Sequence, residues 1–179
     1  YNLAMSMPVF SFGYKEECKE LTQDLRKMIE VNILLEILAG DTSELYNKMF
    51  DNGLINTSFS KEYFTGFGYE AILFDGESVN PQAVADEIKK AVASLKANGI
   101  DDEQFENARR SLYGREIMEY NDIDAIANAV ISAHFNGYSV FDAMEIYKSV
   151  TKEDIEKRLE NMMMEEYSAL SVVKNKENE

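Results

Sequence analysis

The chain has 179 residues, of which 45 % are hydrophobic and 28 % are charged, values that suit one globular domain with a sizeable core. Asp and Glu number 33 against 18 Lys and Arg, which gives a net charge of −15. This acidity argues against binding to nucleic acid, which needs a basic face, and against docking on a membrane of anionic lipid.

Cys18 is the only cysteine, so an intrachain disulfide is excluded, and its acidic neighbours favour a structural rather than a reactive thiol. A reducing compartment is compatible with one cysteine, and we expect the cytoplasm. The apolar runs, such as residues 33–35, fall short of the length of about 18 residues that a spanning helix needs. The chain opens without Met inside a strand-like segment, so we expect a fragment of a longer polypeptide.

Residues 1–14 alternate between two faces, and this period of two predicts a strand. One predicted face carries Met5, Met7 and Val9, and the other carries Phe10, Phe12 and Tyr14. Pro8 cannot donate a backbone hydrogen bond, so we expect it at a strand start or a sheet edge.

A helical pattern follows over residues 17–39, and its second half is apolar nearly all round, which predicts burial on several sides. Gly40 is typical of a helix end. Asp41 or Thr42 can cap a second helix, which we expect to run to Asp51.

Two further strands are predicted at residues 55–63 and 67–75, joined by a turn at Thr65-Gly66. Strands joined so briefly are antiparallel. Their aromatic residues form a binding face, or alternate ones fill the core. These residues are Phe59, Tyr63, Phe64, Phe67, Tyr69 and Phe74.

The remaining chain reads as helices with recognisable starting residues, followed by a last strand at residues 167–173. The predicted helix starts are Asn80-Pro81, Asp101, Asn121 or Asp122, Ser139 and Thr151. The order of elements predicts an α+β fold in which helices pack on one face of a mainly antiparallel sheet. We expect residues 1–174 to form a single noncatalytic domain and residues 175–179 to form a frayed tail.

The chain offers little chemistry of its own. A hydrolytic zinc site needs about three side-chain ligands, whereas His134 is the only histidine. His134 falls near a predicted helix end, where a structural role is favoured over a catalytic one. Acidic clusters such as residues 101–103 lack the spacing of a calcium loop and suit helix starts or solvated faces. We therefore predict no catalytic residue and no metal ligand in this chain.

Several segments in sequence order resemble the pitrilysin/insulinase family of zinc peptidases, in the half that carries no zinc. They are the apolar helix running into ILAGDTSELYNKMFDNGLI, the two strands, the helix near NPQAVADEIKKAV, the segment IDDEQFENARRSLYGR and the late segment SVTKEDIEKRL. Some bacterial branches of the family have a similar Gly-Leu-Ile exit from the second helix.

The resemblance implies one half of a clamshell, with the fold seen in the mitochondrial processing peptidase. The partner is then a zinc-bearing N-terminal half or subunit that supplies the cofactor, and the ligand is a peptide. Family register implies peptide contacts at Phe50, Asn56, Ser58 and Tyr63. Many members carry Arg at the position of Phe50 and Tyr at the position of Asn56, so the resemblance implies no direct part in catalysis here.

The function expected from this resemblance is that of a chamber wall and peptide-binding platform opposite the zinc-bearing half. Two alternatives stay open. The chain can be a free-standing subunit without zinc that pairs with a separate zinc subunit, or a purely structural α+β domain without a peptide site.

Overall fold

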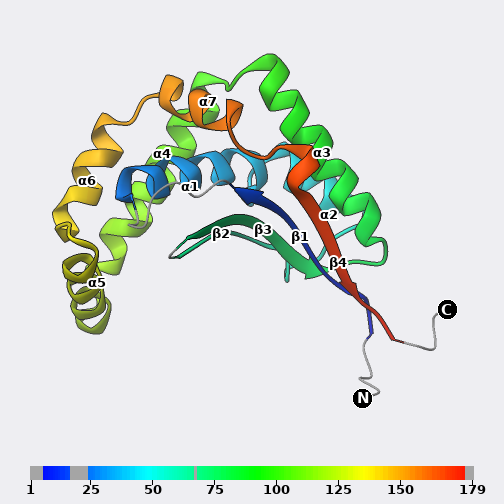
Figure 1. The fold of residues 1–179 in the computed structure, drawn as a ribbon, viewed down its shortest axis with the longest axis horizontal. Coiled ribbons are helices and arrows are strands. Elements are labelled where there is room, and N and C mark those ends of the chain that lie inside the picture. Colours follow the sequence, from blue (N-terminus) through cyan, green and yellow to red (C-terminus); the bar gives the residue numbers. More distant parts are fainter. Residues whose placement is uncertain (1–5, 17–23, 67, 176–179) are drawn as a thin grey trace.

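A four-stranded antiparallel sheet, covered on one face by helices, forms the frame of the molecule (Figure 1). The computed structural model describes residues 6–16, 24–66 and 68–175. Along the chain the elements are β1 (Val9–Glu16), α1 (Leu25–Ala39), α2 (Glu44–Asp51), β2 (Ser60–Gly66), β3 (Tyr69–Glu77), α3 (Pro81–Asn98), α4 (Asp102–Glu119), α5 (Ile123–Asn136), α6 (Val140–Ser149), α7 (Lys152–Glu160), the 3-10 turn η1 (Glu165–Tyr167) and β4 (Ser168–Val173). The predicted α+β class is confirmed.

The strands lie in the order β2-β3-β1-β4, and every neighbouring pair is antiparallel. The first and last strands are therefore neighbours, with β1 inside the sheet and β4 at its edge. Phe12 of β1 stands opposite Phe74 of β3 on one side and Leu170 of β4 on the other. Among the described residues, β2 and β4 are the two outer strands.

The side chains of β1 alternate between the two faces of the sheet, as the period of two predicts. Phe10, Phe12 and Tyr14 are each 1 % exposed beneath the helices, whereas Val9 is exposed on the outer face. The strand begins at Val9 rather than at the predicted residue 1, and residues 6–8 precede it as bends and irregular backbone. Residues 1–5 lie outside the described part of the chain.

Helix α1 crosses the inner face of the sheet, and nine of its 15 residues are buried. Asp24 caps its start by accepting from the backbone N–H groups of Arg26 and Lys27, so the described helix begins later than predicted, and residues 17–23 are not described. At its end, a Cβ on Gly40 would lie 2.4 Å from the carbonyl oxygen of Glu36. Glycine is thus needed there for space, since φ is −66° and not left-handed.

The hairpin turns two residues later than predicted. Thr65 and Gly66 still pair with Glu70 and Tyr69, so they belong to the strands. Gly68 has a φ of +78°, which glycine adopts without the cost that a Cβ imposes. The left-handed residue therefore sets the turn, and the strands end at Gly66 and resume at Tyr69.

Short polar side chains start the helices by accepting from free backbone N–H groups. These caps are Asp24, Ser43, Asn80, Asp101, Asp122, Ser139 and Thr151. Ser43 takes the position predicted for Asp41 or Thr42, because its hydroxyl accepts from the N–H of Tyr46. The other starts predicted for the helices after residue 80 are confirmed.

Ion pairs tie α1 to distant helices and to the sheet. Glu30, whose side chain is 5 % exposed, accepts from Arg158 of α7 and from Arg26, each Nε lying 3.0 Å from a carboxylate oxygen. Glu36 pairs with Lys61 of β2 at 3.0 Å and with Arg115 of α4 at 3.1 Å. Each carboxylate thus joins segments that are far apart in sequence.

The buried Glu16 holds the connection that leads into β4. Its carboxylate accepts from the backbone N–H of Met163 at 2.9 Å, and Met163 has a left-handed φ of 53°. Burial raises the pKa of Glu16, while Met163 and Lys27 oppose that shift and Glu70 adds to it. Lys96 donates to the carbonyl oxygen of Met162 at 2.6 Å and so holds the same connection.

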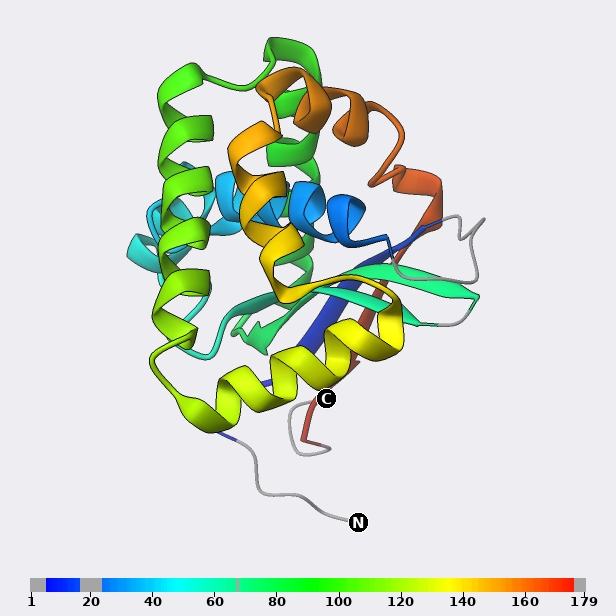
Figure 2. The same ribbon diagram turned by 90° about the vertical axis from the view of Figure 1, so that its left-hand side faces the viewer.

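Helix α5 stands apart from the layers (Figures 1 and 2). Its described packing neighbour is α6, and Ala133 is its one buried residue among those described. Together with the end of α4 and most of α6 it lies at one side of the molecule (Figure 1), and we call residues 116–147 the arm, although Ala143 and Tyr147 of α6 belong to the buried core.

Candidate functional site

A ladder of aromatic rings runs from the core to the surface. Phe12 packs on Phe74 at 6.4 Å and Phe74 packs on Phe59 at 6.4 Å, and both pairs are stacked. Phe59 lies 6.0 Å from Tyr46, and Tyr46 stacks on Phe50 at 5.8 Å. Phe50, at the end of α2, is 43 % exposed, so the ladder ends in a ring that a ligand can contact.

Asn56 and Ser58 lie together in the loop before β2 and connect this loop to Glu77 at the end of β3. The Nδ2 of Asn56 donates to a carboxylate oxygen of Glu77 at 2.9 Å, and its Oδ1 accepts from the N–H of Ser58 at 2.8 Å. The hydroxyl of Ser58 accepts from the backbone N–H of Glu77 at 3.1 Å. Ser58 is exposed, whereas Asn56 is half-buried.

Tyr63 lies on the inner face of β2, since it stands opposite the buried Ile72 and packs against the core. Burial raises the pKa of Tyr63, and a hydrogen bond to the carboxylate of Glu70 adds to the shift. The structure therefore brings Asn56 and Ser58 together, places Phe50 on a neighbouring helix, and turns Tyr63 toward the helices.

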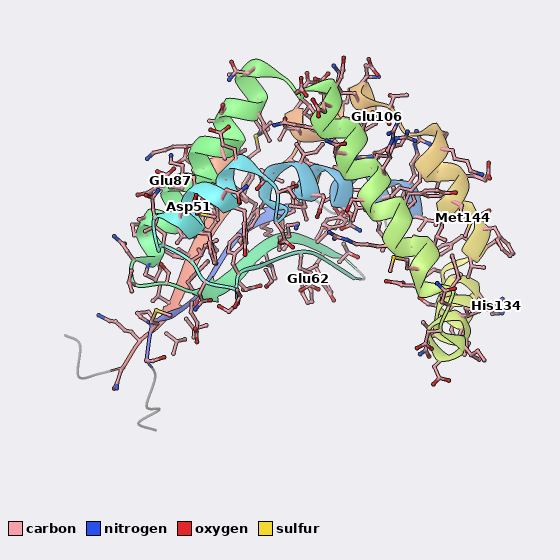
Figure 3. All side chains as sticks on the ribbon, turned by 180° about the vertical axis from the view of Figure 1, so that it is seen from behind. Asp51, Glu62, Glu87, Glu106, His134 and Met144 are labelled. Atoms are coloured by element: carbon pink, nitrogen blue, oxygen red, sulfur yellow. The ribbon has the colours of Figure 1, made fainter. Side chains whose placement is uncertain are left out.

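The outer face of the hairpin carries two aromatic rings that sequence reasoning could not separate from the core set. Phe64 and Tyr69 are each 45 % exposed and lie 5.2 Å apart. Tyr69 also covers Gly66, where a Cβ would lie 2.3 Å from the ring. Glu62 points away from the helices on the same strand (Figure 3). Of the predicted aromatic set, Phe74 fills the core and Phe64 is exposed, so the core reading holds for part of the set and the binding face stays a prediction; Phe67 lies outside the described residues.

A hollow of about 250 Å³ lies between α1, α2, α3 and the start of α4, and its rim is charged. Glu87 on this rim pairs with Lys48 at 2.5 Å and with Lys90 at 2.8 Å. The two ammonium groups hold the pKa of the Glu87 carboxyl below its usual range. Sequence reasoning missed this cluster, because Lys48 and Glu87 are 39 positions apart and only the fold joins them.

The described residues contain no group of three His, Cys, Asp or Glu side chains that could hold a metal ion. His134 is exposed near the end of α5, and its ring lies 6.0 Å from that of Phe135. Cys18 lies outside the described part of the chain. None of the helices in that part has the length and apolar character required for a bilayer crossing.

The fold is an α+β domain with a four-stranded antiparallel sheet, and its described residues offer no metal-ligand cluster. Residues 3–112 match the family described as the Peptidase M16 inactive domain. Because this match covers more than half of the 179 residues, the chain belongs to that family. The predicted resemblance to the zinc-less half is confirmed.

Relatives agree with this assignment. A protein named zinc protease YmfH, from Bacillus subtilis (strain 168), is 28 % identical over 146 residues, which are 81 % of this chain and 33 % of the relative. A solved structure named as an M16-like peptidase from Alicyclobacillus acidocaldarius superimposes with a TM-score of 0.88 at 24 % identity, over 96 % of this chain and 42 % of that one.

A solved structure with a similar fold has nearly the same extent as this chain. It is the inactive peptidase domain of a protein named as a zinc protease from Bordetella parapertussis, with a TM-score of 0.78 and 13 % identity. The superposition covers 98 % of this chain and 96 % of that chain. The chain thus spans about a third of the Bacillus relative and less than half of the Alicyclobacillus chain, but almost all of the Bordetella domain.

Proposed function

We propose that the chain acts as the noncatalytic half of a zinc-dependent peptidase, forming a chamber wall and a peptide-binding platform opposite a zinc-bearing half. The observation that carries the proposal is the inactive-domain match, combined with relatives named as peptidases that extend far beyond the matched region. Zinc then belongs to the other half, where it supplies the Lewis acid and the activated water of hydrolysis.

The platform is the outer surface that runs from the end of α2 to the hairpin. An extended peptide can add to the open edge of β2 through main-chain hydrogen bonds, while side-chain pockets supply selectivity. The aromatic ladder connects Phe50 through Tyr46 to Phe59, the residue before β2, and Phe64 is exposed on the strand itself. Asn56 and Ser58 keep the loop between them in place, and Tyr63 supports the strand from beneath.

The acidity of the chain favours binding of basic peptides. With a net charge of −15, the chain attracts peptides rich in Lys and Arg and repels acidic ones. Binding remote from the reacting atoms contributes to catalysis by holding the scissile bond near the metal centre.

A free-standing subunit is the second candidate; the Bordetella chain is named as a domain of a zinc protease, so its extent does not distinguish the two arrangements. In this arrangement the zinc-bearing subunit is a separate polypeptide, and the peptide platform is unchanged. The reading frame that contains this chain distinguishes the two arrangements.

The test uses a fluorescein-labelled, Lys-rich peptide of extended sequence and an acidic counterpart, titrated against the chain with and without the zinc-bearing half. We expect Phe50→Ser combined with Phe64→Ser to weaken binding of the Lys-rich peptide by about tenfold, as loss of central aromatic contacts does. Val79→Ser is the matched control, since Val79 is 66 % exposed outside the platform. Equal affinity of the platform variant and the control would rule out this surface.

A further inference from the structure

Helix α5 is apolar on two faces, and the chain covers only one of them. Ala133, on the covered face, is 3 % exposed. On the other face Ile123 is 82 % exposed, Ile131 54 % and Phe135 83 %, with Val130 also exposed. Val130, Ile131 and Phe135 follow Ile123 by seven, eight and twelve positions, which places all four residues on one side of the helix.

Apolar residues on either side of α5 extend this stripe within the arm. Ile117 and Met118 at the end of α4 are 42 % and 70 % exposed, and Phe141 at the start of α6 is 68 % exposed. Single exposed apolar residues are ordinary, but such a concentration on one projecting element marks an interaction site. A helix that is apolar nearly all round is normally buried.

The charge within this surface is mainly negative, although Arg115 and Lys148 flank it and Lys148 pairs with Glu145 at 2.8 Å. Residues 116–147 contain six carboxylates and neither Lys nor Arg, and five of these carboxylates are exposed. They are Glu116, Glu119, Asp122, Asp124, Asp142 and Glu145, of which only Glu116 is half-buried. Two copies of the arm would bring these carboxylates together, and an anionic bilayer would repel them.

We infer that the arm is the surface through which this domain docks on the zinc-bearing half, at an apolar patch of that half bordered by Lys and Arg. The inference rests on the proposed function. The size of the relatives supports this occupant, because the chain spans 33 % of the Bacillus relative and 42 % of the Alicyclobacillus chain. More than half of each of those polypeptides therefore has to pack somewhere, and the arm offers uncovered apolar area with an acidic border.

The arm and the platform are built from different elements, α4 to α6 for the arm and α2 to β3 for the platform. The tip of the β2–β3 hairpin points toward α5 (Figures 1 and 3). Mutations on α5 and mutations on the hairpin therefore test docking and peptide binding separately.

Sedimentation velocity of the chain mixed with the separately produced zinc-bearing half measures the docking. We expect the double variant Ile131→Ser, Phe135→Ser to raise the dissociation constant by at least about tenfold, and Glu119→Lys to raise it by about threefold. The control Val79→Ser, Val173→Ser removes exposed apolar side chains outside the arm and the platform and should change the dissociation constant less than about twofold. Circular dichroism checks that each variant is folded.

The outcomes separate the two proposals. If the unmodified chain binds the zinc-bearing half and the arm variant binds equally well, the arm is not the docking surface, while the pairing of halves stands. If the unmodified chain does not bind that half at all, the proposed function fails as well. If the unmodified chain forms dimers that the arm variant abolishes, a second copy is the occupant and the inference is overturned.

Discussion

Helices α1 and α5 are both rich in apolar residues, but the chain covers one and exposes the other. α1 lies between the sheet and the surrounding helices and buries nine residues, whereas α5 packs on α6 and buries Ala133. An apolar pattern therefore indicates that a helix has a covering partner without saying which molecule provides it. For α1 the partner is this chain; for α5 we have inferred another polypeptide.

Removing one aromatic ring from the buried core and one from α5 gives the largest difference in the free energy of unfolding. Phe74 is fully buried in the aromatic ladder, so Phe74→Ala should lower the free energy of unfolding by about 3–5 kcal/mol. Phe135 is 83 % exposed, so Phe135→Ala should change it by less than about 0.5 kcal/mol. Urea denaturation followed by circular dichroism measures both. A loss of several kcal/mol from Phe135→Ala would mean that the arm is covered within the isolated chain.

The ion pairs of α1 provide a second, smaller effect. Arg158→Met leaves the buried carboxylate of Glu30 with Arg26 as its remaining pairing residue among those described, which should cost about 3 kcal/mol. Combining Glu30→Leu with Arg158→Met removes the stranded charge, so the double variant should recover part of that loss. A double variant less stable than Arg158→Met would show that the carboxylate stabilises the fold through other contacts.

Glu16 gives the smallest effect and a defined pH dependence. Burial raises its pKa in the folded chain above the ordinary value of 4.5, so the native state holds the proton more tightly than the unfolded state does. Stability contributed by this group is therefore present below pH 4.5 and is lost as pH rises through the raised pKa. Glu16→Gln keeps an acceptor for the Met163 N–H but cannot ionise.

We expect the free energy of unfolding of Glu16→Gln to match that of the unmodified chain in acid and to exceed it as pH rises toward neutrality. Urea titrations across the acid range measure the difference, with Glu62→Gln on the outer face as the control. A stability difference that did not change with pH would show that ionisation of Glu16 is not its cause.

Local signals in the sequence located most of the fold. The alternation in β1 identified the buried face with Phe10, Phe12 and Tyr14, and the caps Asn80 and Thr151 gave helix starts to within a residue. The hairpin turn was misplaced because Thr65-Gly66 and Gly68 both suit a turn. The backbone places only Gly68 in the left-handed region, while Gly66 accommodates the ring of Tyr69.

Contacts between distant segments could not be predicted from the sequence. Glu30 and Arg158 are 128 positions apart, and neither has a local pattern that reveals the other. The same limit applies to the surface residues. Family register named Phe50 and Tyr63 together, yet Phe50 is exposed on α2 and Tyr63 lies on the inner face of the sheet, toward the helices. Exposure depends on which elements pack above a residue, and that is decided by the whole fold.

The pairing of the first and last strands has a mechanical consequence. Val9 at the start of β1 stands opposite Val173 at the end of β4, so traction on the two flanking segments acts at the same end of the strand pair. When force acts at one end of an antiparallel pair, the hydrogen bonds between the strands break one after another and do not share the load. A motor that pulled this domain from those segments would meet low resistance at β4 and could strip that strand before the helices yield.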